Sequence, residues 1–473
     1  MRTVTGIGRD RPDVVLVVVD TARRDRFGCY GYGRATTPTI DSLSSEGRLV
    51  ETMIANAPWT LPSHASLFTG LYPSQHGAQW QTGPTLNDGV KLTLAELLRD
   101  AGYETICATN NGLISSRTGL ARGFDRYAFR LDLERGWRRK ARRARKLLAG
   151  GDSGGRVVNR WIKQQARDVK KPLFLFVNYL ECHWSYTPPR GLQRDVGGRR
   201  IGFFRDLRYR LELADRVGPW EAIARADDDA LDVYSTLYDA EHRNVDGHVT
   251  ELMDILESTG HLRDGETIVI VTSDHGEHIG EHGLADHHAS LDDLLVRVPF
   301  MAWGPGLVPP GPRDGTYEFV DVMPSLARLL DLPMPVPYLS ERRTDLFHSD
   351  GAAADGDLAF AEWRSWTEKE LTRLRARNPS YDFSKLTRDL VCARTSSFKL
   401  VRAGDGSETL FDLQNDPGEE VDVASEHPKE AAKLGTELDR QLETWRSWRG
   451  TANELSDEDE REIEQHLADL GYI

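Results

Sequence analysis

The chain of 473 residues is long enough for a large core and predicts one large structural unit with a smaller one beside it. Hydrophobic residues make up 39% of it and charged residues 28%, as in a globular protein, and the formal net charge of −14 argues against nonspecific nucleic-acid binding. The four cysteines are scattered without a CxxC pair, the N-terminus is polar, and no apolar run reaches membrane-spanning length. These features predict a cytoplasmic protein with free thiols and no membrane span.

The first structural signal is a run of Val and Leu at residues 14–19, which ends in Asp20. Continuous runs of this kind are typical of central parallel strands buried on both faces. In open α/β sheets, ligands bind beyond the carboxyl ends of such strands, so Asp20 lies where a functional residue is expected. The same residue serves equally well as a strand end that caps the next turn.

Residues 57–73 combine a hydroxyl side chain with a helix start. Pro62 suits the first turn of a helix that continues toward Gly70, which would place Thr60 just before that helix. The first-turn amides and the positive end of the helix dipole form a seat for a tetrahedral anion. On this stretch alone, a capping role for Thr60 is favoured, since Ser and Thr are common caps.

Two further strands are expected to end in polar side chains. Residues 172–180 read as a buried strand followed by His183, and residues 267–273 as a β-branched strand followed by Asp274 and His275. A lone histidine is more often structural than catalytic, so His183 carries little weight by itself. Between the two strands, residues 231–257 repeat apolar side chains at helical spacing and predict a long helix.

Residues 60–70 resemble the signature of the sulfatase family, in the alkaline phosphatase superfamily. In that signature a Cys or Ser, any residue, Pro, Ser and Arg precede an apolar stretch that ends in Thr-Gly. This chain departs from it with Thr60 at the nucleophile position and His64 at the Arg position. The resemblance implies an α/β fold with a large, mixed but mostly parallel sheet sandwiched by helices, and a smaller C-terminal α+β subdomain.

The resemblance also assigns roles to the strand-end residues. It implies one divalent metal ion held by Asp20, Asp274, His275 and Thr60, although the family's second acid beside Asp20 is replaced by Thr21. Oxygen ligands suit Ca or Mg, whereas a histidine ligand allows Mn or Zn. No convincing ligand set for a second metal is apparent.

Three histidines receive roles from the same resemblance. His183 stands ahead of an aromatic residue and two prolines, as the family's catalytic His does, and would serve as a general acid or base. His287 precedes Ser290 and Leu291 at the place of a family residue that binds the anion. His64 and His287 are therefore expected to bind the oxygens of the substrate.

The resemblance divides the chain into a catalytic domain at residues 1–345 and a C-terminal subdomain at residues 346–473. Residues 130–165 and 190–230 are not covered and are interpreted as insertions, the second as an irregular, substrate-facing loop. The basic segment 136–147 is favoured as a solvated helix, and contact with an anionic substrate, a partner or a membrane surface is the alternative. A short helix is expected at residues 462–470.

The threonine at position 60 bears on the substrate. Family sulfatases convert Cys or Ser to formylglycine, and a threonine cannot become an aldehyde at that carbon. We therefore predict a metal-dependent hydrolase that cleaves a phosphate monoester, a diester or a related small anionic ester through a covalent Thr60 intermediate. The alternatives are a sulfuric ester hydrolase, a phosphoryl-group transferase acting on a second metabolite, and a non-catalytic anion-binding relative. Oligomeric state stays open.

Overall fold

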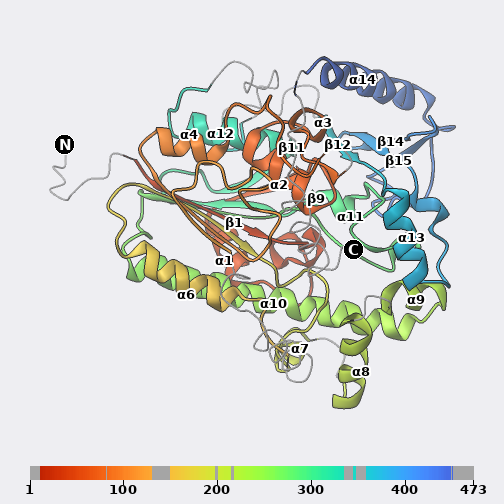
Figure 1. Cartoon of the computed structure of the whole chain (residues 1–473), viewed down its shortest axis with the longest axis horizontal. Coiled ribbons are helices and arrows are strands. Elements are labelled where there is room, and N and C mark those ends of the chain that lie inside the picture. Colours follow the sequence, from red (N-terminus) through yellow and green to blue (C-terminus); the bar gives the residue numbers. More distant parts are fainter. Residues whose placement is uncertain are drawn as a thin grey trace.

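In the computed structural model the chain is built on a nine-stranded mixed sheet (Figure 1). The structure describes residues 11–80, 83–129, 150–197, 201–214, 218–334, 345–347, 358–448 and 450. Eight strands follow the order β11-β2-β10-β6-β1-β5-β3-β4, and β9 pairs with β2. Their bounds are β1 Asp13–Val19, β2 Arg48–Ile54, β3 Glu104–Thr109, β4 Arg126–Phe129, β5 Leu173–Tyr179, β6 Thr267–Ser273, β9 Arg297–Val298, β10 Phe300–Trp303 and β11 Gly311–Glu318.

The strand β1 lies at the centre of this sheet, as its β-branched run predicts. It pairs in parallel with β5 on one side and with β6 on the other, and all of its residues are buried. Val19 is in register with Tyr179 of β5 and with Ser273 of β6. The residues that follow these three strands therefore meet at one edge of the sheet.

Helices cover both faces of the sheet (Figure 1). One face packs against α1 (Pro38–Glu46), α6 (Gly155–Ala166) and the long α10 (Asp228–Ser258), which confirms the helix expected at 231–257. The other face packs against α2 (Thr60–Thr69), α4 (Leu94–Asp100) and α12 (Val322–Leu329). The short α3 (Pro73–His76) follows α2. Two apolar cores thus hold the sheet between helix layers.

Residues 190–230 are helical rather than irregular, which corrects the sequence-based expectation. They form α7 (Leu192–Asp195), α8 (Phe203–Ala214) and α9 (Gly218–Ala224) within their described parts. The buried face of α8 is largely polar: Arg210 donates from Nε to Asp206 at 2.7 Å, one turn away, and from Nη2 to the carbonyl of Pro188 at 2.9 Å. Because this face buries an ion pair, it lacks the apolar period by which a helix is recognised.

A second, antiparallel sheet follows near the C-terminus. Its order is β12 (Ala359–Trp363), β13 (Leu390–Arg394), β14 (Phe398–Ala403) and β15 (Glu408–Asp412), so residues 390–402 form two paired strands. The helix α14 (Pro428–Ser447), expected from the sequence, packs on this sheet. The helix α13 (Glu368–Arg377) lies between β12 and β13 in the chain. The division at residue 345 stays a prediction.

Some expectations fall outside the described residues, namely the basic segment 136–147, the helix at 462–470 and most of the interval between the proposed domains. In the part of the chain that the structure does describe, none of the helices combines the length and the apolar character needed to cross a bilayer.

Candidate active site

Thr60 begins the helix α2 instead of preceding it, one residue away from the expected position. The N-cap is Trp59, which makes no side-chain cap hydrogen bond, and every residue of α2 is buried. The Thr60 hydroxyl instead lies 3.4 Å from Nε2 of His275 and 3.5 Å from Nδ2 of Asn111. A capping role, favoured from the stretch alone, is therefore wrong.

Asp20, Asp274 and His275 converge beside this hydroxyl. One ligand atom from each lies within 4.8 Å of the others, and all three side chains are fully buried. Oδ2 of Asp20 accepts a hydrogen bond from Asn111 at 2.8 Å, and Oδ1 of Asp274 accepts one from the backbone amide of Thr21 at 3.1 Å. Oδ1 of Asp20 and Oδ2 of Asp274 accept none.

Two buried carboxylates with unsatisfied oxygens are costly unless a positive charge joins them. Burial and the neighbouring charge of Asp274 raise the pKa of Asp20 well above its ordinary value. Against the effect of burial, attraction to the imidazoles of His275 and His64 lowers the pKa of Asp274. Carboxylate oxygens, an imidazole nitrogen and a hydroxyl form a donor set that fits one divalent cation.

Thr21 stands where the family carries its second acid, and it does not supply a ligand. Its hydroxyl donates to the carbonyl of Asp20 at 2.8 Å, and its backbone amide is bound to Asp274. Its φ is 58°, in the left-handed region. The side chain therefore stabilises the turn after β1.

His287 and His183 line up beside His275. The ring centroid of His287 lies 4.4 Å from that of His275 and 5.4 Å from that of His183. Nδ1 of His287 contacts Asp286 at 2.8 Å and Glu277 at 3.0 Å. Although burial opposes protonation, these two carboxylates raise the pKa of His287 to about 10, so its ring is cationic near neutral pH. This charge suits the binding of an anion.

His183 has a fixed ring orientation. Its Nδ1 donates to the carbonyl of Trp184 at 2.8 Å, which assigns proton exchange with a ligand to Nε2. The side chain is buried, with 4% exposure. This geometry is that of a positioned general acid or base.

His64 lies behind the site. Its Nδ1 is 2.9 Å from the carbonyl of Thr60 and 3.4 Å from Oδ2 of Asp274, and its ring packs edge-on against Phe68 and Phe176. Burial lowers the pKa of His64, which favours the neutral ring. His64 therefore supports α2 and Asp274, and its contact with a substrate oxygen stays a prediction.

The structure adds residues that the sequence analysis missed. Asn111 and Asn178 both approach Oδ2 of Asp20, at 2.8 Å and 3.5 Å. Asn111 lies just beyond β3, at the same edge of the sheet, so the strand-end argument that selected Asp20 would also have found it. Glu277 and Asp286 flank the histidines and hold His287 cationic.

Other groups of histidines and acids also meet among the described residues. They are His278 with His282 and Asp292, Asp286 with His287 and His288, and Asp152 with Glu181 and His248. His282 is bonded through both ring nitrogens, to Asp292 at 2.7 Å and to the carbonyl of Gly418 at 2.8 Å. An imidazolium that donates twice explains this contact without a metal ligand.

Replacement of His282 by glutamine is expected to remove a pH-dependent part of the stability. The hydrogen bond to Asp292 raises the pKa of His282 to about 9, so its contribution is full below pH 6.5 and is lost as pH rises through 9. Because the ring is partly exposed, we expect about 1 kcal/mol. Urea unfolding should show a wild-type advantage at pH 6 that disappears at pH 10, and an advantage that is the same at both pH values would contradict the prediction.

Comparison with known proteins points to one family. Residues 12–332 match the family model described as Sulfatase. A curated relative named uncharacterized sulfatase YidJ, from Escherichia coli K12, is 26% identical over 86% of this chain and 82% of its own length. An arylsulfatase from Clostridium perfringens is 23% identical over 89% of this chain and 92% of its own.

A solved structure gives the same fold. The phosphonate monoester hydrolase of Agrobacterium radiobacter superimposes with a TM-score of 0.66 at 20% identity, over 95% of this chain and 99% of that one. The expected architecture, a large mostly parallel sheet between helices with a small C-terminal sheet, is thereby confirmed.

Proposed function

This chain belongs to the sulfatase family, and from that premise we propose that it is a metal-dependent hydrolase of a small phosphate ester, with Thr60 as the nucleophile. The observation that carries the proposal is the position of the Thr60 hydroxyl, 3.4 Å from His275 and next to two buried carboxylates with unsatisfied oxygens. A hydroxyl in this setting is suited to attack an electrophilic phosphorus.

Asp20, Asp274, His275 and Thr60 would hold one divalent cation. When bound there, such a cation neutralises the charge of the ester and lowers the pKa of a hydroxyl. The two carboxylates suit Mg or Ca, and the imidazole of His275 also suits Mn or Zn.

Residues of the chain would bind the ester, attack it and transfer protons. Cationic His287 binds an anionic oxygen of the ester. The Thr60 hydroxyl loses its proton to solvent and its Oγ1 attacks phosphorus, the bond to the alcohol oxygen breaks, and Nε2 of His183 gives that oxygen a proton. Water then attacks the phosphothreonine, with the same imidazole taking its proton, and releases phosphate with a regenerated hydroxyl. When the threonyl ester is hydrolysed in this way, Oγ1 takes a proton back from solvent.

Thr60 favours phosphate over sulfate as the transferred group. A threonyl sulfate would be released only by attack on sulfur, because the residue cannot be converted to the formylglycine that expels sulfate by elimination. A threonyl phosphate is open to attack by water at phosphorus. The second candidate is a sulfate ester hydrolase, which is favoured by the names of the curated relatives.

The test is a panel of aryl phosphate monoesters, phosphate diesters, phosphonates and sulfates, each with Mg, Mn, Ca or Zn. We expect turnover of a phosphorus ester to exceed that of the matching sulfate, and intact-protein mass after a rapid acid quench to show a phosphoryl group on Thr60. A faster sulfate ester with no adduct on Thr60 would establish the second candidate instead.

Replacement of His183 by alanine is expected to act through the leaving group. General-acid catalysis contributes about 10² to 10⁴-fold, so the single-turnover rate at which an alkyl ester phosphorylates Thr60 should fall by that factor. A 4-nitrophenyl ester, whose alcohol leaves without a proton, should lose much less. Equal losses for both esters would assign His183 a structural role, because misfolding or misplacement affects both alike.

A further inference from the structure

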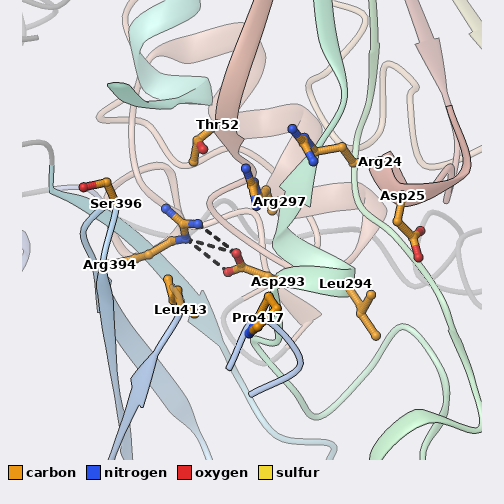
Figure 2. A pocket seen from close by; sticks show the side chains of 10 residues that line it. All are labelled: Arg24, Asp25, Thr52, Asp293, Leu294, Arg297, Arg394, Ser396, Leu413 and Pro417. Atoms are coloured by element: carbon orange, nitrogen blue, oxygen red, sulfur yellow. Dashed lines mark hydrogen bonds and ion pairs between the residues drawn. The ribbon is translucent and has the colours of Figure 1, made fainter. Parts of the chain in front are cut away.

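A separate cavity lies where the edge of the large sheet meets the C-terminal sheet (Figure 2). Its volume is about 370 Å³, enough for a tetrahedral oxyanion with several waters at about 30 Å³ each. Arg24, on the 3₁₀ turn η1 (Arg24–Arg26), and Arg297, on β9, contribute from the large domain, and Arg394 from the end of β13. None of the residues placed around Thr60 lines it.

Two of the three guanidinium groups have acidic partners. Arg394 forms hydrogen bonds to both oxygens of Asp293, at 2.8 to 3.2 Å, as the dashed lines of Figure 2 show. Arg24 pairs with Glu51 at 3.1 Å, and its guanidinium carbon lies 3.8 Å from the ring centroid of Tyr30. These contacts keep the two side chains in place.

Arg297 has no such partner among the described residues. Its Nη2 donates to the carbonyl of Glu51 at 3.1 Å, its buried Nε has no hydrogen bond, and no ion pair is formed. Burial and the neighbouring Arg24 lower the pKa of Arg297 to about 10; Asp293 acts in the opposite direction, and Arg394 acts in the same direction as Arg24. A half-buried cation that crowds two others is destabilised unless an anion joins it.

The acids nearby are already engaged. Asp293 is shared by Arg394 and by Lys399, whose Nζ lies 3.2 Å away. Asp25, which also lines the cavity, accepts hydrogen bonds from Arg23 at 2.9 Å and 2.7 Å. Asp293 also attracts Arg297 but forms no ion pair with it, so the charge of Arg297 is balanced only in part and a ligand could balance the rest.

We propose that this cavity is a second anion-binding site, in which Arg297 and Arg24 hold a tetrahedral oxyanion away from Thr60. The oxyanion has two conceivable sources, an inorganic phosphate or sulfate from solution and an anionic group at the far end of a substrate. Guanidinium groups donate in a fork that matches both, so the shared chemistry is that of a multiply charged oxyanion. This site does not depend on the reaction assigned to Thr60.

The direct test is anomalous diffraction from crystals of the whole chain soaked in selenate. We expect a selenium peak within hydrogen-bonding distance of Arg297 and Arg24. It should vanish in Arg297→Gln and persist in Arg99→Gln, which removes the same charge from an exposed site on α4. Wild-type crystals without a peak in the cavity, or a peak unchanged in Arg297→Gln, would overturn the proposal.

Binding in solution adds a second readout. Because charge-assisted hydrogen bonds to a guanidinium are about twice as strong as neutral ones, we expect Arg297→Gln to weaken sulfate binding at least tenfold by calorimetry. Arg24→Gln serves as the second variant if Arg297→Gln does not fold. A sulfate affinity equal to that of wild type in both variants would refute the site.

Kinetics distinguish the two sources. If the cavity takes the far end of a substrate, Arg297→Gln should raise KM at least tenfold for an ester with a second anionic group and leave a singly charged ester unchanged. If the cavity takes a free anion, KM for both esters should stay unchanged while selenate binding is lost. Both outcomes support an anion site. If wild type hydrolysed none of the esters, only the reaction proposed for Thr60 would be contradicted, because the anion site is tested by selenate binding.

Discussion

Replacing Thr60 with alanine is expected to lower kcat by about 10⁴-fold or more, the range seen when a nucleophile is removed from a catalytic set that acts as a unit. The physical reason is that the substitution removes the hydroxyl that lies 3.4 Å from Nε2 of His275, the atom that the mechanism makes the nucleophile. The measurement is single-turnover kinetics on the best ester of the panel, with intact mass to follow the adduct. Thr60→Ser, which keeps a hydroxyl, should retain part of the activity and form the same adduct.

Thr69→Ala is the matched control for this prediction. Thr69 is a buried threonine of the same helix whose hydroxyl donates to the carbonyl of Ala65 at 2.6 Å, so the substitution removes the same atoms at the far end of α2. We expect a loss of about 1 kcal/mol of stability and nearly unchanged kcat. If Thr60→Ala and Thr69→Ala lowered kcat alike, Thr60 would be part of the scaffold instead of the nucleophile.

The sequence predicted those parts of the fold in which the buried side chains follow a simple, regular pattern of apolar residues. Residues 14–19 and 267–273 are continuous β-branched runs, and they form the adjacent parallel strands β1 and β6. The rule that parallel strands present their carboxyl ends at one edge then brought Asp20, Asp274 and His275 together, within 4.8 Å in the structure. Local patterns and one topological rule were enough for this.

The remainder depended on contacts between segments far apart in the chain. Asn111 joins the site by a hydrogen bond to Asp20, 91 residues away; its place after β3 puts it at the same edge of the sheet, but the hydrogen bond itself cannot be read from its own stretch. The helix α8 was missed because its buried side chains include Arg210 and Asp206, a pair that is stable only in combination. The unsatisfied charge of Arg297 is visible only when its neighbours are known.

The roles of the histidines show the same limit. His287 and His64 were both expected to bind the anion, yet their surroundings differ. His287 faces two carboxylates and is cationic, while His64 packs on two phenylalanine rings, with a backbone carbonyl at 2.9 Å and one carboxylate, that of Asp274, at 3.4 Å from its Nδ1. Sequence placed both near the site, and only the three-dimensional environment separates a charged ligand for an anion from a neutral support.

Removal of divalent cations is expected to abolish activity and to leave two buried carboxylates that repel each other. Asp20 and Asp274 are both fully buried, and an oxygen of each lacks a hydrogen bond. Without a cation, these carboxylates repel each other in a medium that screens charge weakly. Dialysis against EDTA should eliminate turnover, and one of Mg, Mn, Ca or Zn should restore it.

Asp20→Asn tests this repulsion through the free energy of unfolding instead of activity. The amide removes one buried charge while its carbonyl oxygen still accepts from Asn111, so in EDTA the variant should unfold with a free energy about 1 to 2 kcal/mol above that of wild type. With the restoring cation present, wild type should be the more stable protein, because only its two carboxylates bind that cation tightly.

Asp239→Asn is the control for Asp20→Asn, since Asp239 is equally buried but already paired with Arg26 at 3.1 Å and Arg34 at 2.6 Å. Breaking such a pair leaves two half-buried guanidinium groups without this buried carboxylate, so this variant should be less stable than wild type with and without the divalent cation. Urea unfolding of the three proteins in EDTA decides the matter. If Asp20→Asn were destabilised in EDTA as Asp239→Asn is, Asp20 would be a structural residue and the cation site would have to lie elsewhere.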